Sequence, residues 1–301
     1  MASNNQISPA AGVGIVKADT VDVVAAKVRK FQENGELHFP ANYSPENAMK
    51  SAWLCIQETK DRNGRPALEV CTKTSIANSL LNMVVQGLNP AKKQCYFIVY
   101  GNQLTLQRSY FGAIHIAKTV DPSIEDVTAH VVYEDEVESV DIQTVDGYDV
   151  VVGHRKNPFR KPGSSEIVGA YATVIYSDGR RRSTVMSMAD IKKAWSMSKA
   201  GAIRSDGELN PASTHAKFTE EMAKKTVINR ACKAIINTSD DSTLLMKAYR
   251  ETDADIAEAD AQEEIQANAN QAPLLVDNDT GEVIDNADGL LAQDTPSDDL
   301  P

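Results

Sequence analysis

Residues 94–117, "QCYFIVYGNQLTLQRSYFGAIHIA", decide the fold class of this chain. Two β-rich runs flank Gly101 and Asn102, and both of these residues tolerate the positive φ that a two-residue hairpin turn requires. A short helical pattern over 113–118 follows directly. The stretch therefore predicts a β-hairpin that passes straight into a helix.

An arginine and two aromatic residues, Arg108, Tyr110 and Phe111, stand where the strand pattern becomes helical. A guanidinium group can bind phosphate oxygens, and an aromatic ring can stack on a nucleobase. We therefore interpret the junction as a candidate site for a flat, anionic ligand. Adjacent aromatic residues at a helix start commonly bury one ring, so we expect at most one of the two to face the ligand.

The residues before the hairpin predict helices. Residues 1–18 are small and polar, and Asp19 then caps a helical pattern that ends at Gly35. Ser44 caps a second pattern, with a proline at its first helical position, and a third pattern ends before Pro90. The first third of the chain is therefore expected to be helical.

The residues after the hairpin predict strands and then helices. Strand patterns recur between 124 and 187, with turns expected at Asp146-Gly147 and Asp178-Gly179. Helical patterns return over 188–201 and 214–237. This order predicts an α+β domain with a central antiparallel sheet flanked by helices.

The charge of the chain is divided between its body and its C-terminal end. The net charge is -11, but residues 251–301 hold 15 acidic residues and no Lys or Arg, which leaves 27 acidic and 31 basic residues in 1–250. A polar segment with one sign of charge buries too little apolar surface to offset its ordering entropy. We expect an N-terminal arm and helix over 1–34, a core over 35–240, and an acidic, largely disordered tail over 241–301 that contacts partners.

The body is itself polarised. Residues 121–152 carry 10 acidic residues and no Lys or Arg, whereas residues 154–233 carry 16 basic and 7 acidic residues. The basic residues gather in two loop-like stretches and two helical patterns, which favours contact with a phosphate backbone. The candidate DNA-contacting residues are Arg108, Tyr110, Phe111, Lys118, Arg155, Lys156, Arg160, Lys161, Arg180, Arg181, Arg182, Lys192, Lys193, Lys199, Lys217, Lys224, Lys225 and Arg230.

Structural interpretations stand beside these candidates. Helical spacing places Trp195 on an apolar stripe, which favours a core position over base stacking. Glu221 lies four residues from both Lys217 and Lys225, so intrahelical ion pairs explain these lysines as well as DNA contact does. The acidic run "YEDEVESVDIQ" is read as a solvated sheet edge in preference to a Mg²⁺ site.

Several function classes lack their signals. The chain has no phosphate-cradling G-x-x-x-x-G-K-[ST] loop, no H-E-x-x-H and no G-x-S-x-G, and its five histidines show no metal-ligand spacing. The four cysteines sit among apolar neighbours and are expected to be reduced core thiols. No signal peptide or membrane span is evident. We therefore expect a cytoplasmic, non-enzymatic protein with no cofactor beyond an effect of Mg²⁺ on its reaction.

Two blocks, "GLNPAKKQCYFIVYGNQLTLQRSYFGAIHIA" and "EEMAKKTVINRACKAI", resemble the RecT family of phage single-strand annealing recombinases, particularly those of prophages in Gram-positive bacteria. The resemblance covers about 35–236. It implies ATP-independent coating of single-stranded DNA, pairing with a complementary strand, and assembly into rings or helical filaments. It also implies a 5′ to 3′ exonuclease and the host single-stranded-DNA-binding protein as partners, and an α+β core related to eukaryotic ring-forming annealing proteins.

By this resemblance, Arg108 and Tyr110 match the block after the hairpin, and the basic helix supplies Lys224, Lys225 and Arg230 as DNA contacts. The chain departs from the family pattern at Phe111, where a lysine is common. Either the Phe111 ring stacks on a base in place of the phosphate contact of that lysine, or the ring packs inward. Further departures are Val99 in place of proline and Asn229 in place of a basic residue.

Three hypotheses follow. The first is strand annealing, in which phosphate contacts hold one strand extended and Watson-Crick pairing tests the second. The second is a Mg²⁺-dependent nuclease using carboxylates such as Glu134 and Asp149. The third is passive binding of single strands, which would block pairing instead of accelerating it.

Overall fold

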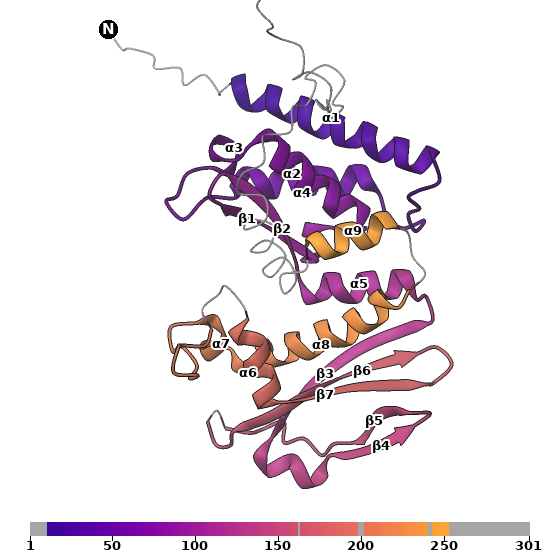
Figure 1. The fold of residues 1–301 in the computed structure, drawn as a ribbon, viewed down its shortest axis with the longest axis vertical. Helices are drawn as coiled ribbons and strands as arrows, with labels where there is room; N and C mark the ends of the chain where they lie inside the picture. The colour runs from indigo at the N-terminus through magenta and orange to yellow at the C-terminus, as the bar shows by residue number, and fades with distance from the viewer. Residues whose placement is uncertain (1–10, 162, 198–201, 240–242, 253–301) are drawn as a thin grey trace, which may run out of the picture. The chain divides into compact units, whose positions relative to one another are not determined.

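The computed structural model describes residues 11–161, 163–197, 202–239 and 243–252. The chain divides into one compact unit, Met1–Glu258, and a second unit, Ala259–Pro301. The described residues belong to the first unit and combine helices with antiparallel sheets, which confirms the predicted α+β class (Figure 1).

The N-terminal helices pack over the predicted hairpin. They are α1 (Ala11–Glu33), α2 (Pro45–Glu58), α3 (Ala67–Val70) and α4 (Lys73–Val85). Ser44 caps α2 as predicted, and its side chain accepts a hydrogen bond from Asn47 N. The expected cap at Asp19 is wrong, because α1 already begins at Ala11. Gly35, at φ +73°, follows the end of α1, as predicted.

The hairpin and the following helix form as the sequence predicts. After the short 3-10 helix η1 (Pro90–Lys92) come β1 (Cys95–Tyr100), β2 (Gln103–Arg108) and α5 (Tyr110–Val120). Gly101, at φ +60°, makes the tight turn, with Tyr100 paired to Gln103. Helix α5 starts three residues before the predicted start because Ser109 caps it, accepting a hydrogen bond from Gly112 N.

The predicted sheet is divided into smaller ones. Strands β3 (Ile124–Tyr133), β6 (Ile167–Tyr176) and β7 (Arg181–Ser187) form one antiparallel sheet in the order β3-β6-β7. The 3-10 helix η2 (Glu134–Ser139) interrupts the strand pattern, and β4 (Asp141–Val145) and β5 (Tyr148–Gly153) then pair separately. The β4–β5 hairpin lies beside β7, and Val151 N donates to Ser183 Oγ at 3.0 Å.

Both predicted turns in the sheet region are present. Asp146 and Gly147 have φ of +52° and +81°, the left-handed pair of the favoured two-residue hairpin turn. Gly179, at φ +85°, supplies the positive φ of the turn between β6 and β7.

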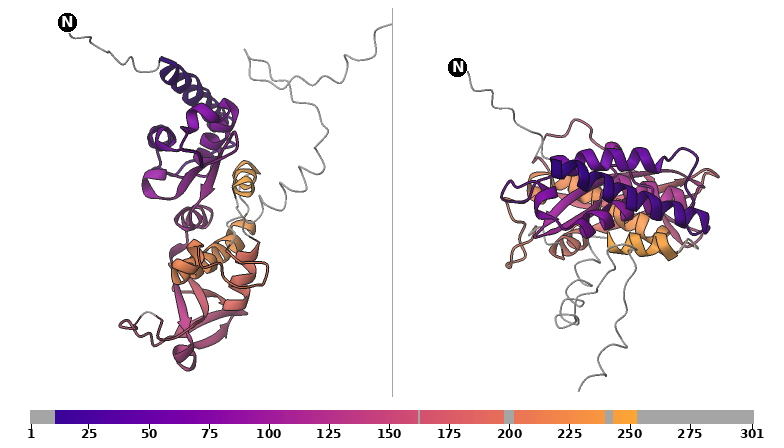
Figure 2. Two further views of the ribbon diagram at one scale, coloured as in Figure 1. Left: turned by 90° about the vertical axis from the view of Figure 1, so that its left-hand side faces the viewer. Right: turned by 90° about the horizontal axis from the view of Figure 1, so that it is seen from above.

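The C-terminal helices complete the fold. They are α6 (Met188–Ser196), α7 (Thr214–Lys217), α8 (Thr219–Asn237) and α9 (Thr243–Glu251). Helix α8 packs on β3, β6 and β7 and also against α5, so it joins the sheet to the hairpin region (Figures 1 and 2). The single helix predicted over 214–237 is broken at Phe218, which has φ -133° and ψ 50°.

The compact unit extends beyond residue 240, the expected end of the core. Helix α9 packs on α4, with Ala248 and Tyr249 almost fully buried. The apolar residues of α9 recur at helical spacing. This helical pattern was not recognised because the acidic residues that follow it dominated the interpretation of the segment. The part of the expected tail after Thr252 lies outside the described residues.

The core is continuous from the N-terminal helices to the sheet, with Trp53, Ile116 and Ile236 among its most buried side chains. The four cysteines are free thiols. Burial raises the pKa of the Cys95 and Cys232 thiols to about 12, so both are packed, unreactive core residues.

Gly112 tests the junction between the hairpin and α5. A Cβ at this position would overlap the carbonyl oxygen of Gln94 and lie 2.8 Å from Cγ of Arg108. We expect Gly112→Ala to lower the free energy of unfolding by about 1–3 kcal/mol, measured by urea denaturation. Gly153→Ala is the control, since its Cβ would meet only Asp141 Cβ at 3.5 Å, and equal losses in both variants would contradict this account.

Candidate nucleic-acid interface

Three aromatic side chains come together on the hairpin and α5. The Tyr110 and Phe111 rings lie 4.1 Å apart between centroids. Phe111 and Tyr96 are about half exposed, while Tyr110 is partly buried and packs against the core. Burial chiefly raises the pKa of Tyr110, and the charges of Glu221 and Tyr96 raise it further. Tyr110 therefore stands between β1 and α8.

The first turns of α8 bring charged groups to the same region. Lys224 Nζ lies 2.7 Å from Glu220 and 3.0 Å from Glu221, and the Tyr133 hydroxyl donates to Glu220 at 3.2 Å. Burial lowers the pKa of Lys224, but these two carboxylates outweigh it and raise the pKa overall. The predicted pairs of Glu221 with Lys217 and Lys225 do not form, because Lys224 takes both neighbouring carboxylates and Lys217 lies on α7.

Strand β3 adds a histidine beside a lysine. Lys156 Nζ lies 3.1 Å from His130 Nδ1, and the Tyr171 ring lies 5.6 Å from the rings of both His130 and His154. Burial lowers the pKa of His130, and the charges of Lys156, His154 and Lys224 lower it further. We call the surface formed by Tyr96, Tyr110, Phe111, Lys224, His130 and Lys156 the aromatic-basic face.

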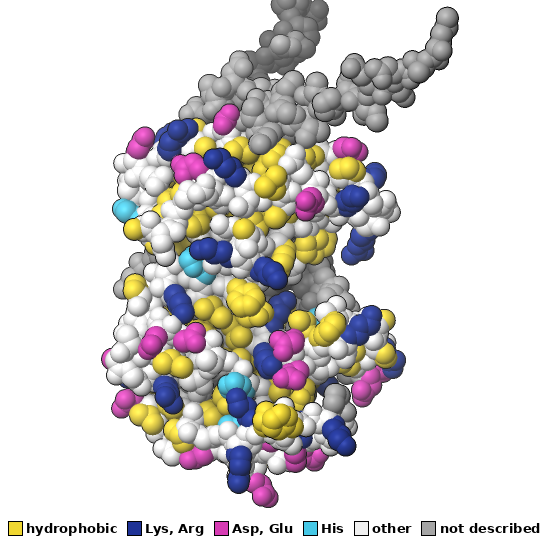
Figure 3. Space-filling view, turned by 180° about the vertical axis from the view of Figure 1, so that it is seen from behind, with side chains coloured by type: hydrophobic (Ala, Val, Ile, Leu, Met, Phe, Trp, Pro, Cys, Tyr) yellow, Lys and Arg dark blue, Asp and Glu magenta, His cyan; other side chains and the backbone are white. Residues whose placement is uncertain are grey.

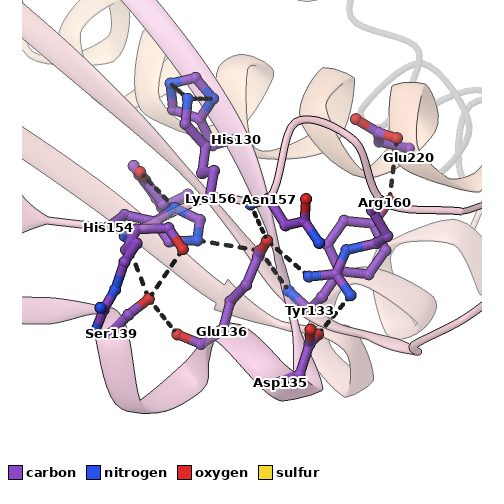
Figure 4. Close-up of polar contacts among 12 residues, drawn as sticks. His130, Tyr133, Asp135, Glu136, Ser139, His154, Lys156, Asn157, Arg160 and Glu220 are labelled. Atoms are coloured by element: carbon purple, nitrogen blue, oxygen red, sulfur yellow. Dashed lines mark hydrogen bonds and ion pairs between the residues drawn. The ribbon is translucent and has the colours of Figure 1, made fainter.

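A buried carboxylate fixes the loop that carries Lys156 (Figure 4). Glu136 is 5% exposed and accepts hydrogen bonds from Asn157 N at 2.8 Å and Arg160 at 2.7 Å. His154 Nε2 lies 3.3 Å from the same carboxylate, and Tyr133 N donates to it at 3.4 Å. Burial raises the pKa of Glu136, but these hydrogen bonds lower it below its ordinary value.

This network corrects the expectation of a solvated sheet edge at "YEDEVESVDIQ". Residues 134–139 form η2, and the Glu136 side chain points inward to partners 18 to 24 residues later in the chain. Arg160 also pairs with Asp135 at 2.6 Å and lies 4.2 Å over the Tyr133 ring. Local periodicity carries no information about such partners, so sequence reasoning missed Glu136 as the anchor of the loop.

Arg108 makes its contacts inside the fold. Its guanidinium donates to Gln86 Oε1 at 3.1 Å and Thr252 Oγ1 at 3.0 Å, and lies 3.9 Å over the Tyr249 ring. The same group donates to the Tyr249 carbonyl at 3.3 Å. Arg108 therefore fastens α9 to α4 and β2, a role that no local pattern in the sequence predicts.

Other candidate residues also have partners. Lys118 donates to Glu125 O at 2.7 Å, Arg180 pairs with Asp178 at 2.5 Å, and Arg182 lies 3.7 Å over the Tyr148 ring. Lys199 lies outside the described residues. Within the described part of the chain, no ion pair is formed by the side chains of Arg155, Lys161, Arg181, Lys192, Lys193, Lys217, Lys225 and Arg230.

These residues come from the 154–161 loop, β7, α6, α7 and α8, so basic charge without an ion pair is spread over several elements. Figure 3 shows one side of the molecule on which hydrophobic, basic and acidic side chains are interspersed around an indented middle band. Trp195 is buried as expected and donates to Thr226 Oγ1 at 2.8 Å, so it is a core residue. Basic groups beside exposed rings can hold phosphates and stacked bases together.

Among the described residues, no group of three or more His, Cys, Asp or Glu side chains is placed to hold a metal ion. In the same residues, no helix has the length and apolar character needed to cross a membrane.

A comparison with known families finds that the RecT family matches residues 46–268 of the chain. This match covers the hairpin, the sheet and helices α2 to α9. No curated protein matches the chain significantly.

The pKa of His130 tests the geometry of the aromatic-basic face. Because the folded chain lowers this pKa below 6.5, the contribution of His130 to stability is lost as the pH falls below about 6.5. We expect Lys156→Gln to raise the pKa of His130, measured from ring proton shifts in an NMR pH titration. Lys27→Gln, on α1, is the control, and an unchanged value in Lys156→Gln would place the lysine away from the ring.

Proposed function

Because the chain belongs to the RecT family, we propose that it binds single-stranded DNA and anneals it to a complementary strand without ATP, within an oligomer that serves homologous recombination. The observation that carries this proposal is the aromatic-basic face. The exposed Phe111 ring contacts Tyr110, and Lys224 of α8 acts electrostatically on both Tyr110 and His130. Lys156 of the 154–161 loop lies beside His130.

The chemistry of this face suits single strands in particular. A single strand offers the flat faces of its bases, whereas a duplex stacks them on one another. Stacking of a base on an aromatic ring contributes about 1–3 kcal/mol and demands no particular sequence. Contacts to the phosphates add binding free energy that decreases as salt is raised, because lysines and arginines displace the counterions condensed on the DNA.

Phe111 fits the stacking role better than Tyr110 does. The Phe111 ring is 45% exposed, and the Tyr110 ring packs beneath it against the core. This arrangement supports stacking at position 111, where family members commonly carry a lysine. Tyr110 then acts as a support for the neighbouring ring.

The annealing reaction itself needs no bond chemistry from the chain. One strand is held extended with its bases presented, and a second strand is tested by pairing. Adjacent copies of the chain hold the correct duplex. In this proposal a 5′ to 3′ exonuclease supplies the single strand, and the host single-stranded-DNA-binding protein is the other partner. The protein works in the bacterial cytoplasm.

The activity can be measured directly with two complementary fluorescent oligonucleotides and purified full-length protein. We expect faster duplex formation than in the protein-free control, without ATP, and an acceleration that fades as salt is raised. Mg²⁺ is varied in parallel. Slower pairing would identify a passive binder, and loss of DNA that requires Mg²⁺ would identify a nuclease.

Lys225 tests whether α8 contacts the DNA backbone. Lys225→Gln should weaken binding to all sequences equally and reduce the slope of log affinity against log salt by about 0.7, one phosphate contact to a single strand. Fluorescence anisotropy across a salt series gives both quantities. Lys50→Gln, on the exposed side of α2, is the charge-matched control. An unchanged slope in Lys225→Gln would remove this lysine from the interface.

A further inference from the structure

A cavity of about 870 Å³ lies where the C-terminal ends of α5 and α8 meet the sheet. Val174 of β6 pairs with Arg182 of β7, so both point to the same face of the sheet. Tyr176 and Thr184, two residues further along these strands, point to that face too, and all four line the cavity. The small side chain of Ala231 on α8 leaves room above them. The volume is in the range of cavities that hold small organic ligands.

This cavity is separate from the aromatic-basic face. That face lies at the first turns of α5 and α8, where Tyr110 and Lys224 stand. The cavity is lined by Thr119 near the end of α5 and by Ala234 in the last turns of α8. At the rise of an α-helix, about 15 Å separates the two sites along each helix. The cavity is therefore a second candidate site and not a part of the first.

Hydrogen-bond donors gather on the strand side of the cavity. The Arg182 guanidinium lies 3.7 Å over the Tyr148 ring and forms no ion pair with the described residues. Tyr176 is 3% exposed, yet its hydroxyl has no hydrogen-bond partner among the described residues. Burial chiefly raises the pKa of this hydroxyl, which keeps it protonated and able to donate. A buried donor without a partner, beside a guanidinium without a carboxylate, favours an anionic ligand.

Hydrogen-bond acceptors lie on the helix side of the cavity. Asp121 follows α5 directly, and its Oδ1 accepts from Ser123 N at 3.1 Å and Ser123 Oγ at 2.5 Å. Its Oδ2 accepts no hydrogen bond from the described residues, and the C-terminal ends of both helices carry the negative pole of the helix dipole. Of the neighbouring arginines, Arg180 pairs with Asp178, and Arg181 points to the opposite face of β7. The cavity is thus polarised, with donors on the sheet and acceptors at the helix ends.

A ligand that fits both sides carries an anionic group at one end and hydrogen-bond donors at the other. Between the two ends the lining is apolar, with Val174, Ala234 and Ile235. A 5′-nucleotide has these three parts. Its phosphate suits Arg182, the flat face of its base suits the apolar wall, and an amino group on the base edge suits the Asp121 carboxylate.

We propose that this cavity binds a 5′-nucleotide, with the phosphate at Arg182 and Tyr176 and the base edge at Asp121. Ala234 and Thr238 are exposed, so the cavity opens to solvent. The same phosphate monoester occurs on a free mononucleotide and on the 5′-phosphorylated end of a DNA strand. The second source rests on the proposed function, because it places the end of a bound strand at a site of its own.

Isothermal titration calorimetry of the full-length chain with dAMP tests the site. We expect Arg182→Gln to weaken dAMP binding about tenfold, because a charge-assisted hydrogen bond is lost. Tyr176→Phe keeps the shape of the ring and should weaken binding about fivefold through the loss of one hydroxyl. Arg181→Gln is the charge-matched control one residue away, and it should bind dAMP like the wild type because Arg181 faces away from the cavity.

Two single-stranded oligonucleotides of one sequence, labelled at the 3′ end, distinguish the sources of the nucleotide. One carries a 5′-phosphate and the other a 5′-hydroxyl, and fluorescence anisotropy gives both affinities. Tighter binding of the phosphorylated strand, lost in Arg182→Gln and on adding dAMP, would assign the cavity to DNA ends. Equal binding of the two strands, with dAMP bound in calorimetry, would assign it to free nucleotides.

The inference and the proposed function fail in different measurements. A wild type that does not bind dAMP, or equal affinity for dAMP in the wild type and Arg182→Gln, would overturn the inference. Inorganic phosphate that binds as tightly as dAMP would overturn it too, because the base would then contribute nothing. A chain that binds dAMP through Arg182 but does not anneal oligonucleotides contradicts only the proposed function.

Discussion

The buried carboxylate of Glu136 governs the surface of the sheet half of this protein. An ionised carboxylate taken out of water without partners costs several kcal/mol, so it must gather hydrogen bonds from whatever the chain places nearby. Here the donors come from Tyr133, Asn157 and Arg160, with His154 beside them. Satisfying one charge therefore folds a whole loop onto the end of the sheet. The position of Lys156 beside His130 and the outward direction of Phe159 both result from this requirement.

The basic residues of the chain illustrate how charge counts and surface charge differ. Residues 154–233 are rich in Lys and Arg, yet Arg160 and Lys224 are neutralised by neighbouring carboxylates, and Arg182 is stacked on a tyrosine. A count of basic residues reveals the polarity of a segment. It does not reveal which charges face solvent, because that depends on carboxylates brought in from other segments.

Local sequence signals predict the turns and helix caps of the fold. The features that the sequence could not predict depend on contacts between residues far apart in the chain. The Gly101 turn, the Ser44 cap and the Asp146-Gly147 turn depend on a few adjacent residues, and all three form as predicted. The packing of α9 depends on tertiary contacts instead, and the break at Phe218, whose side chain is 59% exposed, is not indicated by the local helical pattern. The aromatic pair Tyr110 and Phe111 could be recognised from the sequence because the two residues are adjacent at the junction between strand and helix. The structural role of Arg108 could not be predicted, because its partners Tyr249 and Thr252 lie more than 140 residues away in the sequence.

The anchoring of Thr252 has a consequence for the acidic residues that follow it. Its hydroxyl bonds both Gln86 and Arg108, so the last described residue is fixed beside the start of α5. Forty-nine residues follow it, which can span at most about 175 Å. Any protein that binds this segment is therefore tethered to the body of the chain. Under the proposed function, the encounter of that protein with DNA on the same copy becomes an intramolecular event, governed by the length of the tether and no longer by the protein's concentration in the cell.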